Sequence, residues 1–80
     1  MNIISALRES IEICEGSSKL PESGPCSYEH FVSMWNRIHD IEKRFSIAKI
    51  NRWLGYIQGV MVALEVSTLE EVKEINKRNS

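Results

Sequence analysis

The sequence predicts an all-α protein, a small helical bundle with three main helices and a short C-terminal helix. Apolar residues recur at steps of three and four, which is typical of amphipathic helices, and no stretch alternates with the period of two that strands require. The chain has 80 residues, of which 42% are hydrophobic. This length fits a single helical domain over 1–80, but a core of this size is marginal without added stability. We therefore expect the bundle to be oligomeric.

A first helix is predicted in the segment before Gly16, because Ile4, Leu7, Ile11 and Cys14 share one helical face. Gly16 is a natural end for it. The segment that follows, GSSKLPESGPC, is rich in Gly, Ser and Pro and has no apolar period. Residues 16–26 are therefore predicted to form a flexible loop.

A second helix is predicted from Ser27 to about Arg44. Ser27 is a good N-cap, and Glu29 suits the positive end of the helix dipole. The apolar stripe of this segment consists of Tyr28, Phe31, Trp35, Ile38 and Ile41.

A third helix is predicted over 47–65, with Ser46 as its N-cap and a hydrophobic staple between Phe45 and Ile50. One continuous helix over 27–65 is the alternative. A short fourth helix should follow, capped either by Ser67 with Glu70 or by Thr68 with Glu71.

Residues 53–64 of the third helix are apolar in every direction, with Gln58 as the only fully polar side chain. A helix of this kind has to be covered on all sides, and a second subunit is the economical cover. Gly55 and Gly59 would let another backbone approach closely. The alternative is that they make room for Trp35 or Trp53 in one subunit's core. The predicted subunit interface consists of Gly55, Gly59, Ile57, Val60 and Met61.

Charge is distributed unevenly, although the net charge is only −1. Residues 1–36 carry a balance of −3, residues 37–52 one of +3, and the remainder one of −1. Lys49 and Arg52 lie in this basic zone, next to aromatic side chains and bare glycine backbone, a combination suited to a phosphate and a stacked base. Gln58 should bond either across a subunit interface or to a ligand, because an unpaired buried amide is costly. The predicted ligand-binding residues are Lys49, Arg52, Trp53, Tyr56 and Gln58.

Other chemistries find little support in the sequence. Cys14, Cys26, His30 and His39 do not have a zinc-finger spacing, so no metal is expected. Phosphate loops and nucleophile motifs are absent, so we expect neither an enzyme nor a cofactor. A helix-turn-helix over 36–53 would place core residues in a DNA groove, and the apolar run is too short to span a membrane. The sequence shows no targeting segment, so a cytoplasmic location is expected.

Residues 47–76 resemble a recurring pattern in small accessory proteins of tailed bacteriophages. The matching elements are Arg52-Trp53-Leu54-Gly55, Gln58-Gly59, Thr68-Leu69-Glu70-Glu71 and Ile75-Asn76. The resemblance implies a role in an infected bacterial host, often against host defences. Phage cyclic-nucleotide sponges of the anti-CBASS and anti-Thoeris kind are similar in size, helicity and expected oligomerisation. No sponge motif is matched residue by residue, so this second likeness is one of architecture.

Two functions are therefore expected. In the first, a homo-oligomer binds and sequesters a nucleotide immune signal, a cyclic oligonucleotide or an ADP-ribose derivative, without catalysis. In the second, the protein is an interaction module without a small-molecule ligand. It docks on a host or phage protein through its acidic first helix or a remaining apolar face.

Overall fold

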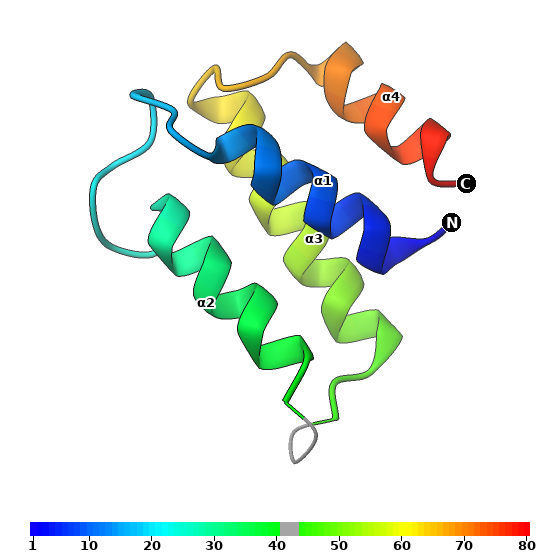
Figure 1. The fold of residues 1–80 in the computed structure, drawn as a ribbon. Coiled ribbons are helices and arrows are strands. Elements are labelled where there is room, and N and C mark those ends of the chain that lie inside the picture. The colour runs from blue at the N-terminus through cyan, green and yellow to red at the C-terminus, as the bar shows by residue number, and fades with distance from the viewer. Residues whose placement is uncertain (41–43) are drawn as a thin grey trace.

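The computed structural model describes residues 1–40 and 44–80 and contains four helices in this part of the chain (Figure 1). They are α1 (Ile3–Cys14), α2 (Tyr28–Ile38), α3 (Ile47–Ala63) and α4 (Leu69–Arg78). Every regular element in the described residues is helical, which confirms the all-α bundle with a short C-terminal helix. None of these helices has the length and apolar character needed to cross a membrane.

Helices α1 and α3 form the centre of the arrangement, because each of them contacts all three other helices. In Figure 1, α1 lies in front of α3, while α2 and α4 flank this pair on opposite sides. The molecule is flat, with principal dimensions of 34 × 30 × 16 Å. One long side of α3 is therefore left without a covering helix.

Each helix begins at a side chain that caps its free N–H groups. Asn2 Oδ1 accepts from the Ser5 N–H at 3.0 Å, and Ser46 Oγ accepts from the Lys49 N–H at 3.1 Å. The Ser27 and Ser46 caps confirm the predicted starts of the second and third helices, and they exclude one continuous helix. At α4, the capping box forms between Thr68 and Glu71, the second of the two predicted pairs.

Helix α2 ends at Ile38, so the prediction that it continues to Arg44 is wrong. The backbone tightens at this point, because the N–H groups of His39 and Asp40 bond to carbonyls three residues earlier. The His39 ring also donates from Nδ1 to the Trp35 carbonyl at 2.9 Å. This side-chain bond takes the carbonyl that the next turn would need. Residues 41–43 of the predicted segment lie outside the described residues.

Helix α3 ends at Ala63, two residues before the predicted limit. Glu65 adopts a left-handed backbone with φ of 61°, and the Val66 N–H bonds to the Met61 carbonyl at 2.8 Å. This is a Schellman ending in which a glutamate occupies the position that usually favours glycine. The Lys19 ammonium reaches across from the 15–27 loop and donates to the Glu65 carbonyl at 2.7 Å.

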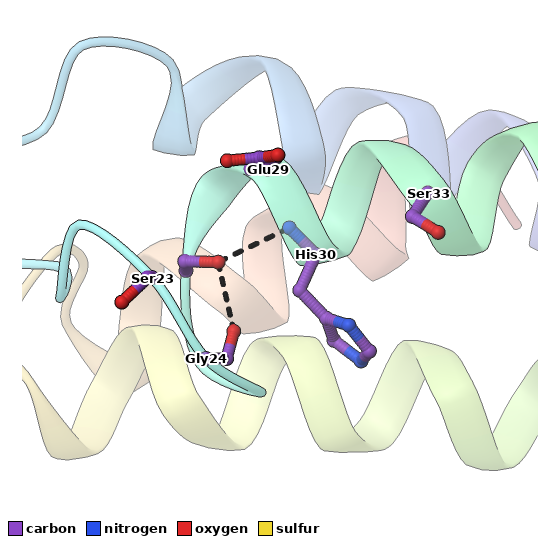
Figure 2. A pocket seen from close by; sticks show the side chains of 6 residues that line it. Ser23, Gly24, Glu29, His30 and Ser33 are labelled. Atoms are coloured by element: carbon purple, nitrogen blue, oxygen red, sulfur yellow. Dashed lines mark hydrogen bonds between the residues drawn. The ribbon is translucent and has the colours of Figure 1, made fainter.

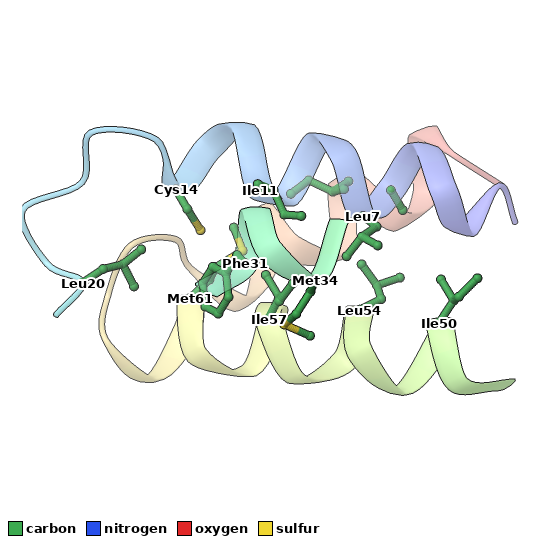
Figure 3. Packing of buried hydrophobic residues seen from close by; sticks show 12 residues of the cluster. Leu7, Ile11, Cys14, Leu20, Phe31, Met34, Ile50, Leu54, Ile57 and Met61 are labelled. Atoms are coloured by element: carbon green, nitrogen blue, oxygen red, sulfur yellow. The ribbon is translucent and has the colours of Figure 1, made fainter. Parts of the chain in front are cut away.

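The core lies mainly between α1 and α3 (Figure 3). Leu7 and Cys14 of α1, Phe31 of α2 and Ile57 of α3 have no exposed surface. Cys14 is therefore a core residue, and burial raises the pKa of its thiol to about 11. Leu20 joins the same cluster, so the loop predicted to be flexible is attached to the core near its middle.

Candidate functional site

Helix α3 has two contrasting faces, and both bear on function. The inner face points into the core, and its members are buried: Ile50, Leu54, Ile57, Gln58 and Met61. The outer face is exposed and carries mostly small side chains: Ala48, Arg52, Gly55, Gly59 and Ala63. The predicted interface and ligand residues divide between these faces.

The predicted interface residues do not share one surface. Ile57 and Met61 have no exposed surface, and Val60 is half-buried. The chain covers them itself, so the argument that these side chains need a second copy loses its basis. Gly55 and Gly59 do lie open on the outer face. Any contact between subunits through α3 has to be made there.

The two glycines have no explanation inside the described chain. A Cβ atom at Gly55 or Gly59 would meet nothing within 4 Å, so neither makes room for Trp35 or Trp53. Each glycine in a helix interior costs about 0.5–1 kcal/mol relative to alanine. The packing of the described chain therefore does not require a glycine at either position.

Lys49 and Trp53 form a compact group with Phe45 at the start of α3. The Lys49 Nζ lies 4.4 Å from the centre of the Phe45 ring and 5.6 Å from that of Trp53. The two rings are 5.1 Å apart. Their faces attract the ammonium by cation–π interaction and hold it beside the outer face of α3, where Arg52 is exposed.

Tyr56 lies one turn beyond Arg52 and is fixed by the loop. Its hydroxyl donates to the Pro25 carbonyl at 2.6 Å and lies 3.5 Å from the Cys26 Sγ. The hydrogen bond with Cys26, and then burial, raise the pKa of Tyr56. The edge of the ring contacts Phe31, with the centroids 6.3 Å apart. The hydroxyl is thus occupied, while the residue as a whole remains exposed.

Gln58 lies apart from the other predicted ligand residues, on the inner face, and only 7% of its surface is exposed. Its Nε2 donates to Ser10 Oγ at 3.1 Å and to Asn76 Oδ1 at 2.9 Å. Asn76 Nδ2 returns a bond to Gln58 Oε1 at 3.1 Å. The amide therefore joins α1, α3 and α4 within one chain, an arrangement that the sequence interpretation did not consider.

A polar hollow at the start of α2 is a further candidate (Figure 2). Ser27 Oγ donates to the Gly24 carbonyl at 2.8 Å and accepts from the His30 N–H at 3.1 Å. Its hydroxyl is therefore used in capping the helix. The His30 imidazole extends away from Ser33 in Figure 2. The Ser33 side chain and the His30 imidazole therefore do not face each other there.

Four candidate soft metal ligands, Cys14, Cys26, His30 and His39, lie within residues 1–40 and 44–80, the part of the chain that the structure describes. There, no group of three or more His, Cys, Asp or Glu side chains is placed to hold a metal ion. Cys14 lies in the core, and Cys26 faces Tyr56.

An apolar groove lies where the N-terminal ends of α1 and α3 meet, and the sequence interpretation missed it. The periodicity places Ile4 on the apolar stripe of the first helix, yet 40% of its surface is exposed. Ile47 directly follows the Ser46 cap and is 73% exposed. A large apolar residue in the first turn of a helix was the signal that could have indicated this surface.

The fold and these surfaces define a class, a small all-α protein in which helix α3 carries one buried face and one exposed face of small side chains. Comparison with known proteins takes the assignment no further. No protein family, no curated protein and no solved structure matches the chain.

Proposed function

We propose that the protein is a non-catalytic homo-oligomer that joins through the outer face of α3 and captures a phosphorylated nucleotide. One observation carries the proposal: Gly55 and Gly59 are open, unneeded by the chain's own packing, and next to Arg52. Two copies related by a two-fold axis would place the same glycines opposite one another. The bare backbone then permits a close approach of the two helices.

The neighbouring side chains support an anionic ligand with an aromatic part. Arg52 offers a planar guanidinium for phosphate, and Lys49 offers an ammonium held by aromatic rings. Tyr56 and Trp53 carry exposed or half-exposed rings on the same side of the helix. Pairing of two outer faces would bring two sets of these groups together, which suits a ligand with more than one phosphate. Gln58 has its partners within the chain and is left out of the proposed site.

The phage resemblance supplies the biological context of the proposal. An oligomer that holds a cyclic oligonucleotide or an ADP-ribose derivative in the cytoplasm of an infected host would lower the concentration of an immune signal. Such sequestration needs affinity and abundance but no catalytic group, and the site described above offers binding chemistry alone.

The oligomer is tested first, by sedimentation or by size exclusion with light scattering at micromolar concentration. We expect a mass of two or more chains for the native protein. Gly59→Leu should reduce the mass to that of one chain, because its side chain fills the space that a second helix would use. Lys77→Leu, on the exposed side of α4, serves as the control. A strict monomer of the native protein contradicts the proposal.

The ligand is tested by calorimetry against a panel of cyclic dinucleotides, cyclic trinucleotides and cyclic ADP-ribose isomers. We expect binding of at least one member and at least a tenfold loss with Arg52→Glu, since removal of a charge-assisted contact costs about 1.5–3 kcal/mol. Lys77→Glu makes the same change in sign far from the outer face and should leave binding intact. The absence of heat with every member rejects the ligand while leaving the oligomer to its own test.

A second candidate function, a protein interaction module without a small-molecule ligand, is favoured by the apolar groove. Met1, Ile4 and Ile47 all expose large side chains along it. Clusters of this kind on a small protein are typical of interaction surfaces.

A further inference from the structure

The apolar groove at the α1–α3 junction continues into a polar hollow, and together they form one surface. The apolar groove is lined by five large apolar residues, Met1, Ile3, Ile4, Ile47 and Ile50. Asn2 and Ile4 line both parts. We call this surface the N-terminal groove. It is separate from the outer face of α3, so the inference does not rest on the nucleotide-binding oligomer; it rests on the second candidate function, the interaction module, and names its partner.

The far part of the N-terminal groove has a different chemistry. It is lined by Ser5, Arg8 and Trp35, in addition to the shared Asn2 and Ile4. The Arg8 guanidinium has only a loose, exposed ion pair, with Nε at 3.8 Å from Glu12. The Trp35 indole packs on one side against His39, with the ring centres 4.5 Å apart, and is half-buried. The groove thus passes from an apolar end to an end with a cation and an aromatic ring.

We propose that the N-terminal groove binds an acidic amphipathic helix of another protein. The charge of the groove selects an anionic partner, because Arg8 is the one charged side chain that lines it in the described residues. An exposed ion pair such as that of Arg8 with Glu12 contributes little free energy, so the guanidinium can exchange Glu12 for a carboxylate of a partner protein.

The geometry of α1 determines what the partner must carry. Ile4 and Arg8 are four residues apart and lie on the same side of the helix, about 6 Å from each other along its axis. A partner helix therefore needs a large apolar side chain for Ile4 and Ile47, and a carboxylate one turn away for Arg8. A second apolar side chain could pack on Trp35. This is the helix-in-groove mode of recognition, with anchors spaced three or four residues apart.

The experiment uses the full chain and a labelled synthetic helix with leucines on one face and glutamates beside them. A second peptide has every glutamate replaced by lysine. We expect the acidic peptide to bind in fluorescence anisotropy and to shift the amide signals of residues 3–8 and 47–50 and the Trp35 indole signal in NMR. The lysine peptide should bind at least about tenfold more weakly, as expected when like charges meet at a contact.

Two variants test the groove, and both change exposed side chains so that folding is preserved. Ile47→Asp should reduce binding of the acidic peptide by at least about tenfold, since it removes a central apolar contact. Arg8→Glu should reverse the preference, so that the lysine peptide binds better than the acidic one. Leu69→Asp changes a leucine that is 54% exposed on α4 and should have no effect.

The result that overturns the proposal is no binding of the acidic peptide at millimolar concentration, or binding that Ile47→Asp leaves unchanged. Two other occupants are tested in parallel. Loss of self-association with Ile47→Asp would assign the groove to a second copy of this chain. Binding to anionic vesicles that depends on Ile47 and Arg8, without binding to the peptide, would assign it to a lipid surface. Either result contradicts the protein partner.

Discussion

The inner and outer faces of α3 belong to one helix but differ completely in burial. Ile57 and Met61 on the inner face are completely buried, whereas Gly55 and Gly59 on the outer face meet nothing. In the sequence these four residues look alike, because none of them has a polar side chain. The difference is size, because burial stabilises in proportion to the apolar area that is removed from water, and a glycine offers almost none. A helix that is apolar in every direction therefore needs cover only where its side chains are large.

The largest expected effect comes from a cavity on the inner face. Ile57→Ala should lower the free energy of unfolding by about 2–5 kcal/mol, since it removes buried methyl groups and leaves a space that the core fills only in part. Urea denaturation measures the loss. Ile47→Ala is the matched control on the same helix, and at 73% exposure it should change stability by no more than about 0.5 kcal/mol. Equal losses would mean that the two faces are not distinct.

The polar member of the inner face tests whether its role is structural. Gln58→Ala should cost about 1–3 kcal/mol, because it leaves the Asn76 amide without its partner in a part-buried position. The double variant Gln58→Ala/Asn76→Ala should lose less free energy of unfolding than the sum of the losses of the two single variants, because the two side chains bond to each other. Asn51→Ala, an exposed amide on α3, is the control. A Gln58→Ala protein of unchanged stability would reopen Gln58 as a ligand residue.

A substitution just after the C-terminal end of α3, where its two faces end, should stabilise the fold. Glu65→Gly should raise the free energy of unfolding by about 1 kcal/mol, because a left-handed backbone costs about that much for a residue with a Cβ. The Lys19 bond to the carbonyl of residue 65 is retained, since it uses the backbone. Thermal unfolding measures the change in stability. Glu74→Gly inside α4 is the control and should lower the stability, because glycine is unfavourable in a helix interior.

A substitution on the outer face can test the stability of the single chain separately from its self-association. Gly59→Ala should stabilise the single chain by about 0.5–1 kcal/mol, because the helix gains propensity and the methyl group meets open space. Unfolding measured at concentrations low enough to keep one chain isolates this gain. A destabilised single chain would show that something within it packs on Gly59.

The smallest effect concerns the closure of α4 on α1. The Arg78 guanidinium and the Asn79 amide bond to the Glu9 carboxylate, and they lower its pKa. A lowered pKa adds stability above the pKa of the unfolded chain, near 4.3, and this part is lost as the pH falls through the folded value. Glu9→Gln should therefore cost less than about 1 kcal/mol at neutral pH, since the pair is partly exposed. The difference from the native protein should vanish in acid, as thermal unfolding between pH 2 and 7 would reveal.

The sequence alone determined the helices, their order and the starts of the second and third helices. Ser27 and Ser46 indicate helix starts through local chemistry, because a short polar side chain bonds to an N–H group three residues away. At the fourth helix the same chemistry left two caps open, and the structure has Thr68. Cys14 belongs to a core stripe by periodicity alone. Such features depend on neighbours in sequence, so the pattern of residues contains them.

Tertiary structure decided what each face of these helices meets. Gln58 finds Ser10 across 48 positions of sequence and Asn76 across 18, so no local pattern could predict that its amide is satisfied within the chain. The early end of α2 depends on where the His39 ring turns. Likewise, the exposure of Ile47 and the openness of Gly55 and Gly59 depend on which helices pack beside them. The physical reason is that propensity and capping act within a few residues, whereas burial is set by contacts among segments far apart in the chain.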